Sequence, residues 1–347
     1  MVGTTIYKLY EPILHKLNRH YLLGFLTEKE VNFMARLPNV EFRQMVPMIR
    51  DPDFYEDEKP RQISWPEYNE AQIKEARETL EFIRNQVDQT QYLNTPGKAG
   101  KPLTDPKELA KAVLACEALG FTERNAQGWL GIIGPFFGIR ESLDDKTIGD
   151  AYDKIEVTHL LKQVFETTKT SDGKLSGDGT GLETSRKQNY ESTKKSGEYM
   201  TSIVDSREIV QAFDVSGEQE CKAMHKLIKK VYGDSLRLDA GVNDRQLVTK
   251  VVEQGMIPYV FPKKNNKLNG DQAWKQMYLE LFYDVMQWLT EYHQRSHAES
   301  FHSSFKRVYG SITKRRVTAQ LNQVTARIIL HNRRRQSYFS KILSPTG

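Results

Sequence analysis

A change of residue pattern near Thr168 is the feature that most restricts how this chain can fold. Before it, apolar residues recur at helical spacing, whereas Thr168–Gly181 is rich in Gly, Ser, Thr and Lys and is followed by strand-like segments. The segments after this point are predicted in the order strand, strand, strand, helix, strand, helix, strand, helix. Strands that alternate with helices indicate a mixed α/β domain on one central sheet, which we expect over residues 170–347.

Short apolar runs and turn residues define the expected elements of this domain. Strands are predicted at 177–184, 199–204, 208–215, 236–239 and 256–261. Asn243 is the expected N-cap of a helix before the last strand. Residues 271–309 contain no proline and are predicted to form one long helix, and a further helix is expected at 316–335.

The region before residue 168 is predicted to be helical. Residues 1–93 form a helical region whose role the sequence does not indicate, and a segment rich in proline and glycine at 94–106 separates it from the next helices. Within 104–166, the helix Pro106–Leu119 and a second helix after Thr122 are joined through Gly120, which favours a helix-turn-helix that binds DNA. An ordinary helical hairpin would give the same pattern.

Composition excludes several classes of protein. With 38% apolar residues and 22 glycines, the 347-residue chain is typical of globular proteins. No window approaches the roughly 18 consecutive apolar residues of a membrane helix, and the N-terminal residues lack the pattern of a signal peptide. Two cysteines, Cys116 and Cys221, cannot build a disulfide framework, so we expect a reducing, cytoplasmic setting and no membrane partner.

Charge is unevenly distributed along the chain. The formal net charge is only +5, yet residues 300–347 contain ten Lys and Arg and no Asp or Glu, which leaves 40 basic and 45 acidic residues before them. A cationic end of this kind favours a polyanionic partner, most simply nucleic acid. Arg315 and the cations of the predicted helix at 316–335, which begins with Arg316, are expected to contact phosphates along the DNA backbone.

The expected helix at 271–309 changes character along one face. At about 100° per residue, one arc of about 60° holds four polar residues, Tyr292, Arg295, Glu299 and Lys306. The same arc is apolar further upstream. A stripe that turns charged where it should face the core marks either a functional site or a solvent-exposed end. The second interpretation is open, because Arg295 and Glu299 also have the spacing of an ordinary surface ion pair.

Two isolated acids upstream give this face a chemical interpretation. Asp178 lies among glycines in the first predicted strand, and Asp239 ends the fourth. Together with Glu299 they would supply the hard oxygen ligands that two Mg²⁺ ions need, and such a pair of ions promotes phosphodiester displacement. Each aspartate also has a plain structural interpretation, because Asp-Gly is a turn signal and Asp239 could cap the next helix.

A four-residue series, Tyr292-x2-Arg295-x3-Glu299-x6-Lys306, resembles the Y-R-E-K signature of prokaryotic insertion-sequence DDE transposases. The surroundings of the two aspartates are similar to those of the upstream acids in that family, and the resemblance covers about residues 171–335. It implies an RNase H-like catalytic domain in which the aspartates lie on neighbouring strands and the glutamate on the following helix. It also implies Mg²⁺- or Mn²⁺-dependent cleavage at transposon ends, followed by strand transfer into target DNA.

The same resemblance implies roles for individual residues. Asp178, Asp239 and Glu299 would hold two metal ions, Arg295 and Lys306 would contact phosphates near the cleaved end, and Tyr292 would pack or hydrogen-bond beside it. The implied partners are double-stranded DNA of the transposon ends and the target, with a homodimer on paired ends. The implied location is the prokaryotic cytoplasm, in association with the nucleoid.

Further basic segments are placed to touch DNA. They contain Arg186, and Lys263 and Lys264 in the loop 262–270, and a solvated surface loop is the alternative for both. His293 and His297 are four residues apart but lack the Glu of the H-E-x-x-H zinc motif, so no zinc site is expected there.

Two other functions share part of this pattern. An RNase H-like nuclease without strand transfer would use the same acids, although the Y-R-E-K spacing argues against it. A DNA-binding regulator derived from a transposase would keep the basic end and lose the chemistry. The three intact acids argue against a pure binder, because carboxylates that face DNA weaken binding.

Overall fold

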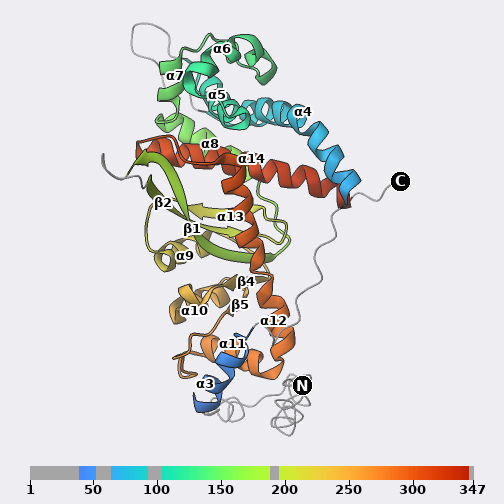
Figure 1. The fold of residues 1–347 in the computed structure, drawn as a ribbon, viewed down its shortest axis with the longest axis vertical. Coiled ribbons are helices and arrows are strands. Elements are labelled where there is room, and N and C mark those ends of the chain that lie inside the picture. Colours follow the sequence, from blue (N-terminus) through green and yellow to red (C-terminus); the bar gives the residue numbers. More distant parts are fainter. Residues whose placement is uncertain (1–38, 52–63, 93–103, 188–194, 344–347) are drawn as a thin grey trace. The chain divides into compact units, whose positions relative to one another are not determined.

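The computed structural model describes residues 39–51, 64–92, 104–187 and 195–343 (Figure 1). The chain divides into two compact units. Unit 1 contains Met1–Arg61, Asp172–Asp178 and Gln219–Ala298, and unit 2 contains Gln62–Ser171, Gly179–Glu218 and Glu299–Gly347. The helices predicted before residue 39 and most of the predicted linker at 94–106 lie outside the described residues.

Five strands form one mixed sheet in the order β3-β2-β1-β4-β5. Their bounds are β1 Lys174–Lys187, β2 Lys195–Val204, β3 Val210–Asp214, β4 Ser235–Leu238 and β5 Ile257–Val260. β2 and β3 pair antiparallel, whereas β1 with β4 and β4 with β5 pair parallel. The parallel pairs follow from the helical connections between these strands, because a parallel neighbour needs a crossover. The predicted mixed α/β architecture is confirmed.

In unit 1, helices surround the parallel strands. They are α3 (Asn39–Met48), α9 (Glu220–Leu227), α10 (Arg245–Glu253), α11 (Gln272–Tyr283) and α12 (Val285–His293), with 3-10 turns η3 (Ile228–Lys230) and η4 (Ala240–Val242). Every residue of β4 is buried, as in a strand covered on both faces. α3 joins this unit through Phe42, whose ring lies 5.0 Å from that of Tyr278.

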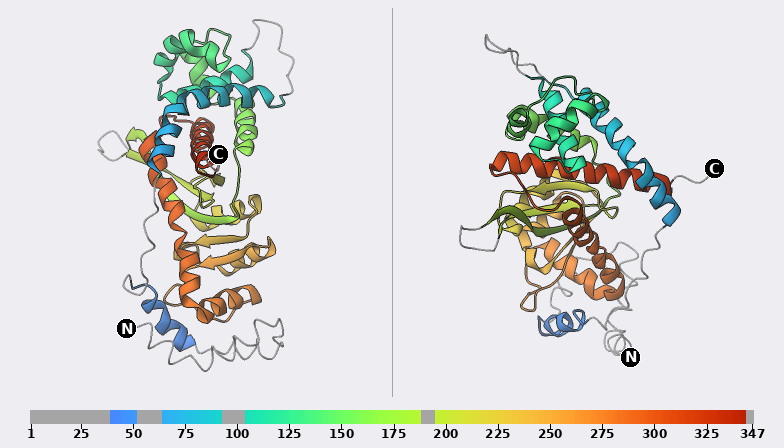
Figure 2. Two further views of the ribbon diagram at one scale, coloured as in Figure 1. Left: turned by 90° about the vertical axis from the view of Figure 1, so that its right-hand side faces the viewer. Right: turned by 45° about the horizontal axis from the view of Figure 1, so that its top comes forward.

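Unit 2 contains most of the helical region that precedes β1. Its helices are α4 (Trp65–Gln89), α5 (Pro106–Leu119), α6 (Glu123–Ile133), α7 (Asp145–Ala151), α8 (Ile155–Thr167) and α14 (Val317–Leu343), with a 3-10 turn η2 (Gly134–Phe137). α14 packs against α4, α5 and α8, and Figures 1 and 2 show it crossing these helices. Val324, Ile328 and Ile329 of α14 are completely buried. The basic C-terminal helix is therefore part of a helical core.

The predicted helix pair at 104–166 forms within unit 2. Asp105 caps α5 by accepting a hydrogen bond from the Lys107 amide, and Gly120 ends it with a left-handed φ of 66°. Thr122 precedes α6 as expected. After α6, the helices α7 and α8 are separated by Tyr152, Asp153 and Lys154.

Two sequence predictions are wrong: the single helix at 271–309 and the N-cap of α10. The single helix expected at 271–309 is three helices, because Asp284 caps α12 through the Gln287 amide and a second break separates α12 from α13 (Ser296–Tyr309). The N-cap of α10 is Asp244, which accepts a hydrogen bond from the Leu247 amide. The Asn243 side chain instead donates to the Phe261 carbonyl and the Tyr278 hydroxyl.

None of the described helices has the length and hydropathy of a membrane span.

Candidate functional site

Asp178, within β1, and Asp239, after the end of β4, each follow the last registered residue pair of these two parallel strands. The register pairs Gly177 of β1 with Leu238 of β4, and the Asp239 backbone continues in extended conformation with φ −69° and ψ 161°. The next residue on each strand is an aspartate. Side chains alternate between the faces of a sheet, so both carboxylates project from the face opposite to that of Leu238. The sequence prediction that the two acids lie on neighbouring strands agrees with this register.

The face that carries the two aspartates is covered by the C-terminal end of α12. The Ser176 hydroxyl, two residues before Asp178, lies 3.2 Å from the Gln294 carbonyl oxygen. Arg295 Nη1 lies 3.8 Å from Asp178 Oδ1, and both side chains are about four-fifths buried. An arginine at this position offsets part of the negative charge on Asp178.

A buried arginine fixes α12 against the sheet. Arg237 of β4 is completely buried, and its side chain donates to the Glu291 carbonyl at 2.6 Å and to the Glu291 carboxylate at 2.5 Å. It also donates to Ser235 Oγ at 3.0 Å. Arg237 and Asp239 are two residues apart and project from the same face. The ion pair therefore holds α12 on the side of the sheet where the aspartates lie. Sequence reasoning missed it, although a lone Arg within the apolar run Ser235–Leu238 was a signal.

Glycines beside the aspartates have a packing role. A Cβ atom on Gly177 would lie 2.7 Å from Leu238 Cδ2 and 2.8 Å from the methyl carbon of Met224 on α9. In unit 2, a Cβ atom on Gly179 would lie 2.8 Å from ring carbons of Tyr199. At these two positions glycine makes room for side chains of this protein, whatever else approaches the neighbouring acid.

Glu299 and Lys306 lie on α13, and both side chains are exposed. They are seven residues apart, about two turns, and so share one face of the helix. Tyr292 belongs to α12 and is buried, with its ring 5.4 Å from Trp288 and 4.9 Å from Phe261. Since the break between α12 and α13 interrupts the predicted helix, the four residues do not lie on one continuous helical face. Their proposed roles at DNA stay predictions.

The other basic residues predicted at DNA are dispersed. Lys264 is exposed and Lys263 is partly exposed in the loop after β5, where Leu268 is buried and Asn266 donates to the Tyr278 hydroxyl. Arg186 belongs to β1, and its side chain lies outside the described residues. Arg315 is exposed. Arg316 is exposed and pairs with Asp153 at 2.6 Å.

Most cations of the acid-free end have carboxylate partners inside unit 2. The pairs are Lys314 with Glu123, Arg316 with Asp153, Arg327 with Glu117, Arg333 with Glu78, Arg334 with Glu75, and Arg335 with Glu208. The Arg327–Glu117 pair is buried on both sides. Most of these cations are thus already paired within unit 2, and the expectation that the helix at 316–335 tracks phosphates stays a prediction. Lys306 and Arg315 form no ion pair among the described residues.

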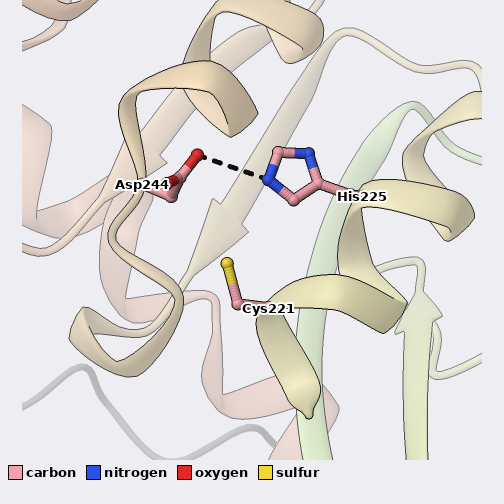
Figure 3. A group of neighbouring side chains, drawn as sticks. All are labelled: Cys221, His225 and Asp244. Atoms are coloured by element: carbon pink, nitrogen blue, oxygen red, sulfur yellow. Dashed lines mark ion pairs between the residues drawn. The ribbon is translucent and has the colours of Figure 1, made fainter. Parts of the chain in front are cut away.

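A second group of ligand-type side chains lies in unit 1 (Figure 3). Cys221, His225 and Asp244 each offer one ligand atom, and these atoms lie within 4.8 Å of one another. Among the described residues, this is the one group of three or more His, Cys, Asp or Glu side chains close enough to share a metal ion. It includes none of the predicted catalytic acids. Sequence reasoning missed it, although Cys221 and His225 have i,i+4 helical spacing. His293 and His297 do not belong to it.

The donor types at the two aspartates fit hard divalent cations. Asp178 and Asp239 are partly exposed carboxylates on one face of the sheet, and Mg²⁺ and Mn²⁺ prefer oxygen ligands of this kind. A third carboxylate, Glu299, was expected from the sequence. It begins the part of α13 that belongs to unit 2.

A comparison with known protein families gives a match for part of the chain. Residues 169–333 match a family model described as the Transposase DDE domain, which supports a DDE transposase domain in this part of the chain. The fold is also similar to a cryo-EM structure of the piggyBac transposase synaptic complex with hairpin DNA, with 10% sequence identity and a TM-score of 0.36. That likeness covers 79% of this chain and 80% of the other. A search of curated proteins finds no match.

Proposed function

We propose that this protein is a DNA transposase whose active site contains Asp178, Asp239 and Glu299. The observation that supports this most strongly is the position of the two aspartates, directly after the last registered pair of β1 and β4, within the segment that matches the transposase domain. Their common face and the neighbouring position of their strands are consistent with an RNase H-like domain.

In this proposal the three carboxylates hold two Mg²⁺ or Mn²⁺ ions, as DDE transposase domains generally use divalent metal ions. Such ions would activate water or a 3′-hydroxyl and stabilise the leaving oxygen of the phosphodiester. Arg295 is a positioning residue, because its guanidinium lies against Asp178 and orients that carboxylate. Lys306, exposed on the same helical face as Glu299, contacts a phosphate of the DNA end.

The DNA-binding part of the proposal includes the helix pair α5–α6 as a helix-turn-helix and a homodimer on two paired ends. α6 exposes Arg124, Asn125 and Gln127, which are side chains able to reach phosphates or base edges. The loop with Lys263 and Lys264 is a further contact in unit 1. A location in the prokaryotic cytoplasm, at the nucleoid, follows from this function.

The deciding experiment compares Asp239→Asn with Asp234→Asn. Both residues flank β4, Asp234 before its first residue and Asp239 after its last, so the second variant is a matched control. We expect Asp239→Asn to abolish Mg²⁺-dependent nicking of DNA that carries the element's ends, because the amide is a poor ligand, and to retain DNA binding. Asp234→Asn should nick normally. Wild-type nicking by Asp239→Asn would rule out the assigned site.

A strand-transfer assay separates the three functions. A transposase joins a cleaved 3′ end to a second DNA molecule, a nuclease releases ends without joining them, and a regulator derived from a transposase only binds. Terminal inverted repeats that flank the coding DNA would supply the substrate and indicate a mobile element.

A further inference from the structure

Three side chains that the proposed function does not use meet between α9 and the start of α10 (Figure 3). Cys221 and His225 lie one turn apart on α9, and Asp244 is the N-cap of α10. His225 Nε2 lies 3.3 Å from Asp244 Oδ1, and the three ligand atoms lie within 4.8 Å of one another. We propose that Cys221, His225 and Asp244 form a Zn²⁺ site that joins α9 to the start of α10.

The donor set selects the metal. A thiolate, an imidazole and a carboxylate are the side chains that Zn²⁺ binds, whereas Mg²⁺ prefers oxygen ligands alone. In a tetrahedral zinc site the ligand atoms lie roughly 3.3 to 3.8 Å apart, given bond lengths of about 2.0 to 2.3 Å. Closing the present group around an ion therefore requires shifts of about 1 Å. All three side chains are partly exposed, so solvent reaches them and water completes the fourth position.

This site is separate from the one that contains Asp178 and Asp239. Met224 of α9 packs where Gly177 lacks a side chain, so α9 covers the face of the sheet opposite to the two aspartates. The Zn²⁺ site nevertheless bears on Asp239, because only η4 and Asn243 separate Asp239 from Asp244, and η4 packs against α9. An ion at Asp244 would fix the segment that follows β4.

The contact between Lys250 and His225 distinguishes a metal site from a hydrogen-bond network. Its Nζ lies 2.9 Å from His225 Nδ1. An ammonium group has only donors, so without metal the ring accepts at Nδ1 and its Nε2–H faces Asp244. When Nε2 binds a metal, the ring proton moves to Nδ1, and Lys250 must withdraw. Lys250 therefore competes with the ion, whereas in a purely structural hydrogen-bond network it would support the three residues.

The test uses the full-length protein after treatment with a chelator and dialysis. Titration with Zn²⁺ against a chromophoric chelator should give one ion per chain. Replacement by Co²⁺ should give the thiolate-to-cobalt charge-transfer absorption of a cysteine ligand and the intense visible bands of tetrahedral coordination. Both should disappear in Cys221→Ser. The matched control is Cys116→Ala, since Cys116 is buried in unit 2 and should leave the spectrum unchanged. A wild-type protein without the thiolate band, or a band that survives Cys221→Ser, would overturn the proposal.

Two further variants sharpen this result. Lys250→Met should tighten Zn²⁺ binding by roughly ten-fold or more, because a nearby cation repels the ion. Weaker binding by Lys250→Met would overturn the proposal in favour of the hydrogen-bond network. Asp178→Asn should bind one Zn²⁺ as the wild type does, and loss of the ion in that variant would contradict a separate site. Since the readout is metal binding, its failure would leave the nicking experiment with Asp239→Asn unaffected.

Discussion

At the scale of single residues, burial determines the protonation state of His331. His331 of α14 is buried, and its Nε2 lies 2.9 Å from the Glu208 carbonyl oxygen, to which it donates. The pKa of His331 is lowered to about 3, chiefly by burial and to a smaller extent by the neighbouring Arg335 and Arg334, while the hydrogen bond to the Glu208 carbonyl acts in the opposite direction. The neutral ring is therefore the form that the folded protein holds.

The pKa of His331 predicts a loss of stability in acid. Because the folded-state pKa is below the ordinary value of about 6.5, only the unfolded chain takes up this proton as the pH falls from about 6.5 towards about 3. The contribution of His331 to the free energy of unfolding should therefore fall over this range by up to about 1.4 kcal/mol per pH unit. Urea unfolding at several pH values measures it.

The control for this prediction is the exposed His159. His331→Gln keeps a donor for the Glu208 carbonyl and removes the titrating ring, so it should flatten the pH dependence below about pH 6.5. His159→Gln should keep the wild-type dependence. Equal slopes for the wild type and His331→Gln would show that other groups control the acid transition.

At the scale of elements, the pairing of β4 with α12 positions the proposed active site. Arg237 is a fully buried cation, and its partner Glu291 belongs to α12, the helix that is followed by Arg295, the residue that contacts Asp178. A buried ion pair costs desolvation free energy, so the pair gives specific placement more than net stability.

Breaking this pair should be strongly destabilising. Arg237→Met leaves the Glu291 carboxylate without its partner, and the expected loss in the free energy of unfolding is about 3 kcal/mol. The double variant with Glu291→Leu should recover much of this loss, because two apolar side chains of similar size need no partner. Urea unfolding of both single variants and the double variant gives the coupling. An additive double variant would mean that the two side chains do not depend on each other.

At the scale of the whole molecule, the uneven charge of the sequence is largely neutralised within unit 2. Six of the ten cations after residue 299 bind carboxylates, most of them from the helices that precede β1. The cations of this segment without a carboxylate partner are fewer than its sequence suggests, and Lys306 is an exposed one that could neutralise a DNA phosphate and so release a counterion.

Salt dependence distinguishes the two kinds of cation. Lys306→Ala should weaken binding to end DNA and reduce the slope of log affinity against log salt by about 0.9, the effect of one lost phosphate contact. Arg334→Ala, whose partner is Glu75 at 2.5 Å, should leave that slope unchanged. Filter binding or fluorescence anisotropy at several salt concentrations measures both. An unchanged slope for Lys306→Ala would place this residue on a solvated face without a role at DNA.

Much of the architecture could be predicted because it depends on local spacing. The hairpin of β2 and β3, the strand that ends before Asp239, and the helices α5 and α6 all follow from alternation, caps and glycine stops near in sequence. The division of residues 271–309 was not predicted, because the cap at Asp284 lies in a segment with continuous helical spacing. The role of Asn243 as a cap was wrong since Asp244, one residue later, makes the hydrogen bond.

The sequence by itself determined the order of the elements and singled out three acids whose roles remain predictions. These features are encoded by residue type and spacing along the chain. Only the tertiary structure decided what the charges and ligands do across long separations. It joined Arg327 to Glu117, Arg237 to Glu291, and Cys221 and His225 to Asp244. The physical reason is that a side chain's partner is fixed by which elements pack together, and no local pattern of spacing contains that information.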